Sequence, residues 1–150
     1  MLEIKNILFP CDLSKNSAKI LPHVLLAAEK HDSSLFLLHV VEDLAKWGTL
    51  HVPHPTLDRF KREALEGAEK ALDDLCETHM QSCPNFKRLI VSGDPVTEIL
   101  KAVDEHQIDL VIMGTHGRKG LEHTLFGSVA ENVIKKASVP VMVVNPYSVK

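Results

Sequence analysis

Short apolar runs alternate along the chain with longer segments in which apolar residues recur at helical spacing. A short run that is apolar at nearly every position is typical of a strand buried on both faces of a parallel sheet. The third run is more polar and is therefore expected nearer a sheet edge. Pro140 cannot donate to a ladder, so the last strand lies at an edge or begins there. The five expected strands are Ile4–Pro10, Leu35–Val41, Phe86–Val91, Leu110–Met113 and Val139–Val144.

Four helices are expected between these strands. The first ends near Lys30, the second covers Leu57–Met80, the third begins at Asp94-Pro95, and the fourth runs from Gly127 to about Lys136. The second has one apolar stripe, formed by Phe60, Ala64, Ala68, Ala71, Leu72 and Leu75. The regular alternation of strand and helix predicts right-handed crossovers and an α/β fold, with a mostly parallel five-stranded sheet covered on both faces.

The connection Glu42–Thr56 is a long segment without a clear period. It contains Trp47, Gly48 and two prolines, and it is long for a loop of a compact domain. Loops of this length are commonly functional.

The length, net charge and cysteine pattern of the chain limit the kinds of protein that are expected. The 150 residues fit one domain, residues 1–150. A net charge of −3 disfavours binding to nucleic acid or to a membrane surface, and no apolar run reaches the roughly 18 residues of a membrane span. The cysteines Cys11, Cys76 and Cys83 are odd in number and form no C-x-x-C pair, which suits a reducing compartment. With no signal-peptide pattern at the start, we expect a cytoplasmic protein.

The stretch from Asp109 to Val133 carries the strongest candidate chemistry. A buried strand passes into Gly114 and Gly117, and a helix then opens at Gly127-Ser128. The first N–H groups of a helix have no partner inside it, and they favour an anion. Glycine allows positive φ and a close approach of the backbone to a ligand. Arg118 and Lys119 favour a phosphate over the alternative, a plain glycine turn.

The expected sheet places this stretch beside the end of the first strand. Ligands of open parallel sheets bind beyond the carboxyl ends of the strands, at the switch point of the strand order. Residues Pro10–Asp12 and Gly114–Gly120 both fall there. The spacing matches neither the P-loop nor the G-x-G-x-x-G dinucleotide fingerprint.

The chain resembles the universal stress protein family in five blocks that occur in order. They are Ile7–Ser14, Leu38–Val40, Asp109–Gly117, Gly127–Val133 and Pro140–Val144. The pattern Gly114-x-x-Gly117, nine residues, then Gly127-Ser128 is similar to the signature of the ATP-binding subgroup. The resemblance implies a three-layer, Rossmann-like fold of the adenine nucleotide alpha hydrolase type. It also implies a homodimer in which Val139–Val144 pairs across a two-fold axis; the alternative is an edge covered by the tail.

The resemblance also implies a role for each matching residue. Asp12 would contact the adenosine, Val40 would offer its backbone groups to the base, and the Ser128 hydroxyl would add a bond to the phosphates. Arg118 and Lys119 would reach the phosphates, and Gly127, Ser128 and Val129 would donate N–H groups to them. The implied nucleotide-binding set is Pro10, Cys11, Asp12, Val40, Met113, Gly114, His116, Gly117, Arg118, Lys119, Gly127, Ser128 and Val129.

Three of these positions have other interpretations. Asp12 could be only a cap of the first helix, or it could serve both as a cap and as a ligand contact; Ser14 also offers cap chemistry there. Family members often have Thr where this chain has Cys11; a thiol is a weaker hydrogen-bond partner than a hydroxyl, but a backbone contact would survive. His116, like His39 and His123, lies near the proposed site without metal-ligand spacing, so no protein metal site is expected. A Mg²⁺ ion carried by the phosphates needs few protein ligands.

Three functions follow from this reading. The first is an ATP-binding stress protein, with ADP or AMP as alternative ligands, that acts as a nucleotide-dependent switch or sensor toward an unknown protein partner. The second is a slow ATPase or nucleotidyl-transfer enzyme at the same site, although the sequence shows no obvious general base for the phosphates other than Asp12, which the adenosine needs. The third is a nucleotide-free interaction module, which the intact glycine signature disfavours.

Overall fold

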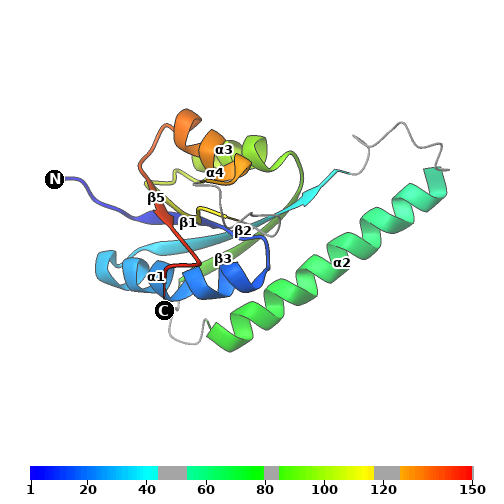
Figure 1. Cartoon of the computed structure of the whole chain (residues 1–150), viewed down its shortest axis with the longest axis horizontal. Helices are drawn as coiled ribbons and strands as arrows, with labels where there is room; N and C mark the ends of the chain where they lie inside the picture. The colour runs from blue at the N-terminus through cyan, green and yellow to red at the C-terminus, as the bar shows by residue number, and fades with distance from the viewer. Residues whose placement is uncertain (44–53, 80–84, 117–125, 150) are drawn as a thin grey trace.

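Five strands and four helices alternate along the chain in a computed structural model (Figure 1). It describes residues 1–43, 54–79, 85–116 and 126–149. The strands are β1 (Asn6–Pro10), β2 (Ser34–Glu42), β3 (Phe86–Gly93), β4 (Leu110–Gly114) and β5 (Val141–Val144). The helices are α1 (Lys15–His31), α2 (His54–His79), α3 (Pro95–Glu105) and α4 (Ser128–Lys136). The predicted order of elements is confirmed, and no described helix is long and apolar enough to cross a membrane.

The strands form one parallel sheet in the order β3-β2-β1-β4-β5. The more polar β3 and the proline-flanked β5 are the two edges, as predicted from Pro140 and the polar third run. The strand order reverses at β1, because β2 follows it on one side and β4 on the other. The carboxyl ends of β1 and β4 therefore define the switch point where parallel sheets bind ligands.

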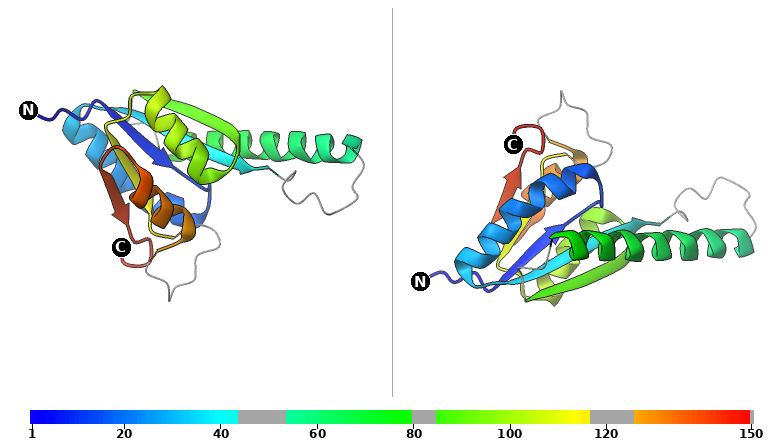
Figure 2. Two further views of the ribbon diagram at one scale, coloured as in Figure 1. Left: turned by 90° about the horizontal axis from the view of Figure 1, so that it is seen from above. Right: turned by 90° about the horizontal axis from the view of Figure 1, so that it is seen from below.

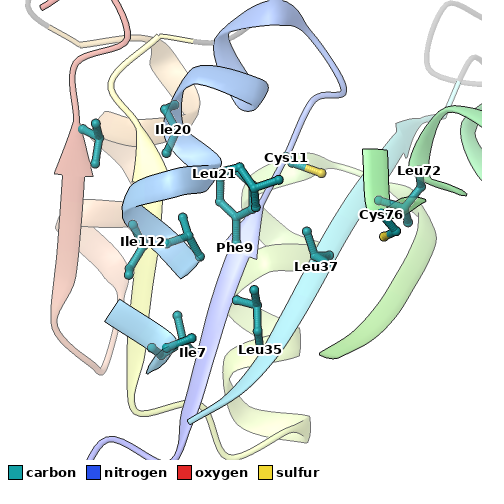
Figure 3. Close-up of a cluster of buried hydrophobic side chains, with 13 residues drawn as sticks. Ile7, Phe9, Cys11, Ile20, Leu21, Leu35, Leu37, Leu72, Cys76 and Ile112 are labelled. Carbon is teal, nitrogen blue, oxygen red and sulfur yellow. The ribbon is translucent and has the colours of Figure 1, made fainter. Parts of the chain in front are cut away.

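Helices cover both faces of the sheet, so the three-layer α/β/α architecture is confirmed (Figure 2). One core joins α1 and α2 to the sheet, and Figure 3 shows Leu21 of α1 beside Phe9 of β1. The second core joins α3 and α4 to the other face through Ile99 and Val133. Because both faces are buried, β1 and β4 are apolar at nearly every position.

The second helix is longer than the face it covers. A helix of 26 residues is about 39 Å long, which exceeds the length of the strands. Its amino-terminal half therefore projects beyond the body of the molecule (Figures 1 and 2). Ala68, Leu72 and Cys76 are buried, whereas Phe60 is 51% exposed. The apolar stripe predicted on this helix is therefore buried only in its second half, because the first half extends beyond the sheet.

The connection before this helix is shorter than predicted. Strand β2 extends to Glu42, and α2 already begins at His54. Most of the expected loop Glu42–Thr56, including Trp47, lies outside the described residues.

Candidate functional site

A cavity of about 690 Å³ opens at the carboxyl edge of the sheet. It crosses the switch point, with the ends of β1 and β4 at its floor and the first turn of α4 on its wall. Its lining residues are Phe9, Pro10, Cys11, Asp12, Leu13, Ser17, Ile20, Leu38, His39, Val40, Val41, Glu42, Ala64, Gly67, Ala68, Ala71, Pro95, Ile99, Met113, Gly114, Thr115, His116, Gly127, Ser128, Val129 and Ala130. A volume of this size suits a ligand as large as a nucleotide.

The cavity exists because β1 leaves the sheet before β2 does. The register pairs Pro10 with Leu38, and the Cys11 N–H donates to the Leu38 carbonyl at 2.8 Å. Leu13 then adopts φ 61°, in the left-handed region, and turns the chain into α1. The second strand continues to Glu42 with β3 as its neighbour on the far side. The side of β2 that faced β1 is therefore open beyond Leu38.

Val40 presents its backbone to this open side. In a parallel strand, both peptide groups of a residue point to one neighbouring strand, and those of the next residue point to the other. Because the Leu38 carbonyl faces β1, the N–H and C=O of Val40 face the same way, where β1 has already ended. One donor and one acceptor therefore point together into the cavity.

Asp12 is fixed by a cluster of hydroxyl groups. Its Oδ1 accepts the Ser14 N–H at 2.9 Å, the Ser14 hydroxyl at 2.5 Å and the Ser17 hydroxyl at 2.7 Å. The N-cap of α1 is Ser14, without a side-chain cap bond. The interpretation of Asp12 as that cap is therefore wrong. The carboxylate lies just ahead of the helix, on the cavity wall.

Both backbone groups of Cys11 already have partners. Its N–H donates to Leu38, and its carbonyl accepts from Nδ1 of His39 at 2.8 Å. The Cys11 N–H is therefore taken, and the predicted backbone contact to a ligand stays a prediction that only its carbonyl oxygen, with a second lone pair, could meet. Burial raises the pKa of its thiol to about 12, so the side chain is a neutral, ligand-lining group.

The cysteines allow a simple test of this packing. We expect Cys11 and Cys76 to resist alkylation by iodoacetamide at pH 7.5, because burial raises both pKa values and the thiolate is the nucleophile. Mass spectrometry of tryptic peptides would show modification at these sites only after unfolding in guanidinium. Fast labelling of Cys11 in the native protein would contradict the buried position.

Two glycines of the signature are required for space and not for an unusual φ. A Cβ at Gly114 would lie 2.6 Å from Ile20 Cδ1, and one at Gly127 would lie 3.3 Å from the Thr115 carbonyl oxygen. Among the glycines described, only Gly93 has positive φ. The prediction of positive φ is therefore wrong for Gly114 and Gly127; the close approach found at both is to other parts of the chain, and the predicted approach to a ligand stays a prediction.

The first turn of α4 lines the cavity with free donors. The Gly127 N–H donates to the Thr115 carbonyl at 2.6 Å, so its predicted bond to a phosphate is wrong. This bond ties the start of α4 to the end of β4. The N-cap, Gly127, has no side-chain oxygen for capping. The first-turn N–H groups of Ser128, Val129 and Ala130 have no acceptor inside the helix, and together they can bind an anion.

His116 is held inside the wall of the site. It is buried, its Nδ1 lies 2.8 Å from the Thr115 hydroxyl, and its ring contacts Tyr147 from the tail. The contact joins the end of β4 to the carboxyl-terminal turn. No cluster of His, Cys, Asp or Glu able to hold a metal occurs among residues 1–43, 54–79, 85–116 and 126–149.

The structure brings most of the predicted site residues together. Ten line the one cavity: Pro10, Cys11, Asp12, Val40, Met113, Gly114, His116, Gly127, Ser128 and Val129. Gly117, Arg118 and Lys119 lie outside the described residues, as does His123.

Sequence reasoning missed the walls contributed by α2 and α3. Ala64, Gly67, Ala68 and Ala71 of α2 line the cavity, and Pro95 enters from α3. The Asp94-Pro95 turn could have been found, because it follows β3 at the same carboxyl edge. The small residues of α2 carried no such signal, since the same pattern describes a core stripe.

Comparison with known proteins decides the family. The model of the universal stress protein family matches residues 3–145. The chain belongs to the universal stress protein family. Universal stress protein MJ0577 of Methanocaldococcus jannaschii is 31% identical over 152 residues, covering 93% of this chain and 94% of the relative.

Solved structures of universal stress proteins agree with this fold. UspA from Lactobacillus plantarum superposes with a TM-score of 0.84 at 27% identity, covering 97% of this chain and all of that one. A universal stress protein from Archaeoglobus fulgidus, solved in complex with dAMP, has a TM-score of 0.66 at 16% identity and covers 95% of this chain and 98% of that one. The second likeness shows the fold alone, and the dAMP belongs to that relative.

Proposed function

We propose that the cavity binds an adenine nucleotide, with ATP as its ligand, and that the protein acts as a nucleotide-dependent switch in the stress response. The observation that carries this proposal is the exposed peptide pair of Val40. Adenine has an acceptor, N1, beside a donor, the N6 amino group. The N–H of Val40 can donate to N1 while its carbonyl accepts from N6. Guanine presents a donor at N1 and an acceptor at O6, which meet the wrong groups.

The remaining polar groups match the rest of the nucleotide. Asp12 offers a carboxylate on the wall next to Val40, where it can accept hydrogen bonds from ribose hydroxyls. The free N–H groups of α4 lie at the other end of the site and suit phosphate oxygens. Pro10 and Met113 supply apolar contacts to the base. A Mg²⁺ ion would be held by the phosphates themselves, with Arg118 and Lys119 as further candidate phosphate contacts.

A binding role fits this geometry better than catalysis. The Oδ1 atom of Asp12 accepts three hydrogen bonds from Ser14 and Ser17, and this fixes the carboxylate beside the helix start. A general base needs to reach the proton it removes. Asp12 stands at the adenosine end of the proposed pose, away from the phosphates.

The test is to identify what the purified protein carries. Mass spectrometry of small molecules released by acid should find ATP, ADP or AMP, and calorimetry of the stripped protein should give saturable heat with ATP. Absence of any adenine nucleotide together with no heat on adding ATP would overturn the proposal. A phosphate-release assay distinguishes a switch, with negligible turnover, from a slow ATPase.

We also infer that β5 forms a homodimer contact within Val139–Val144. This strand is a sheet edge, and its Met142 side chain is 43% exposed. An apolar edge strand is a template for pairing with a second copy. Sedimentation should give a dimer, and Met142→Lys should shift it toward the monomer. A wild-type monomer at high micromolar concentration would contradict this assignment.

A further inference from the structure

The end of the β1–β2 ladder contains an interaction that the strand register alone does not explain. Leu38 pairs with Pro10 in the parallel register, and the Leu38 carbonyl accepts the N–H of Cys11 at 2.8 Å. If the ladder continued by one step, the Val40 N–H would donate to the Cys11 carbonyl. The register ends at the Pro10–Leu38 pair, and among the described residues no bond joins the Val40 N–H to the Cys11 carbonyl. The Cys11 carbonyl, just after the end of β1, has a different partner.

That partner is the imidazole of His39. Its Nδ1 lies 2.8 Å from the Cys11 carbonyl oxygen. A carbonyl oxygen only accepts, so Nδ1 must carry the proton and donate. The neutral ring therefore takes the Nδ1–H tautomer, and the protonated ring makes the same bond. The half-buried side chain of the residue just before Val40 thus takes the acceptor that the Val40 N–H would otherwise use.

We propose that His39 is a positioning residue, which occupies the Cys11 carbonyl and so keeps the Val40 N–H open toward the ligand cavity. The role for nucleotide affinity rests on the proposed function, because it takes the Val40 N–H as the donor to adenine. The effect on the backbone itself does not depend on any ligand. His39 would thus raise nucleotide affinity without contacting the base, because it keeps the β1–β2 hydrogen bonds from extending to Val40.

The physical reason is competition for one acceptor. A backbone N–H without a partner in a partly buried strand costs free energy, so bonding to an acceptor within reach is favoured. The Cys11 carbonyl is the acceptor that strand geometry offers. A carbonyl oxygen has two lone pairs, so the bond from His39 does not exclude a second donor. It satisfies the Cys11 carbonyl and so lowers the free energy gained by closing the ladder, which preorganises the site before any ligand arrives.

Two variants separate this role from simple packing. Asn places an amide nitrogen near the position of Nδ1 and keeps the donor, whereas Leu fills similar space without one. In ligand-free protein, NMR hydrogen exchange should show the Val40 amide unprotected in wild type and in His39→Asn. In His39→Leu it should become protected at least about tenfold, because it now bonds to Cys11.

Nucleotide affinity provides the second measurement. Calorimetry with ATP should show a loss of about tenfold in His39→Leu and a change within about twofold in His39→Asn. In wild type, nitrogen chemical shifts should report the Nδ1–H tautomer. The hydrogen-exchange result does not depend on ATP binding. If neither wild type nor any variant binds ATP, the proposed function is overturned, and exchange still tests the role of His39.

Two results would overturn the role of His39. One is a Val40 amide in His39→Leu that exchanges as fast as in wild type while the variant remains folded. The other is a wild-type ring in the Nε2–H tautomer, which can be observed without any variant and therefore covers the case in which His39→Leu does not fold.

Discussion

Gly114→Ala is expected to lower the free energy of unfolding by about 1–3 kcal/mol, whereas Gly67→Ala raises it by about 0.5–1 kcal/mol. A Cβ at Gly114 would meet Ile20 Cδ1 at 2.6 Å and the His116 carbonyl oxygen at 3.2 Å. Ile20 is buried but also lines the cavity, so its side chain can give way only by leaving its packed position, and the close contact with the His116 carbonyl oxygen remains. Gly67 has no atom within 4 Å of the added methyl, and alanine is the better helix former.

Urea denaturation of the two variants beside wild type measures this difference. Each loses a glycine and gains one methyl, so they are matched in the unfolded chain and differ in native surroundings. Equal effects of the same sign in the two variants would show that Gly114 is not required for the packing of β4 against α1.

Val40→Pro is expected to weaken ATP binding by about 10- to 100-fold while the fold persists. Proline removes the N–H that faces the cavity, and leaving N1 of adenine without a donor costs about 1–3 kcal/mol. No ladder bond is lost, because the N–H of Val40 does not point toward β3. The residue before it is already extended, as proline requires.

Val41→Pro is the matched control. The N–H of Val41 points toward β3, where the register pairs it with Ser92. Proline there breaks a ladder bond and should lower the free energy of unfolding by about 1–3 kcal/mol. Calorimetry and denaturation of both variants test the assignment. It would be contradicted if Val40→Pro bound ATP like wild type, or if Val40→Pro unfolded as readily as Val41→Pro.

Sequence reasoning predicted the fold because the signals were local and consistent. The continuous apolar runs at β1 and β4 indicate strands buried on both faces, and alternation with helices leaves few topologies. Polar β3 and the proline before β5 marked the edges. The position of the site could be predicted because the carboxyl ends of neighbouring parallel strands meet at the same edge of the sheet, where ligands bind.

What the sequence did not reveal depends on competition between groups far apart in the chain. The Gly127 N–H bonds to Thr115, and the Cys11 carbonyl bonds to His39; neither pairing has a periodic pattern. The exposure of Phe60 depends on where the sheet ends beneath α2, which a helical stripe does not encode. Residue propensity and hydrophobic periodicity predict where helices and strands lie. The hydrogen-bond partner of each polar group can be identified only in the assembled structure.

An NMR titration of the labelled protein with ATP tests the central claim most directly. Amide shifts should saturate and be largest at Val40, Gly114, Ser128 and Val129, around the cavity, while Asn6 and Asp109 at the opposite edge stay unchanged. The account would be contradicted by a titration without saturable shifts, or by shifts centred on the amino ends of the strands.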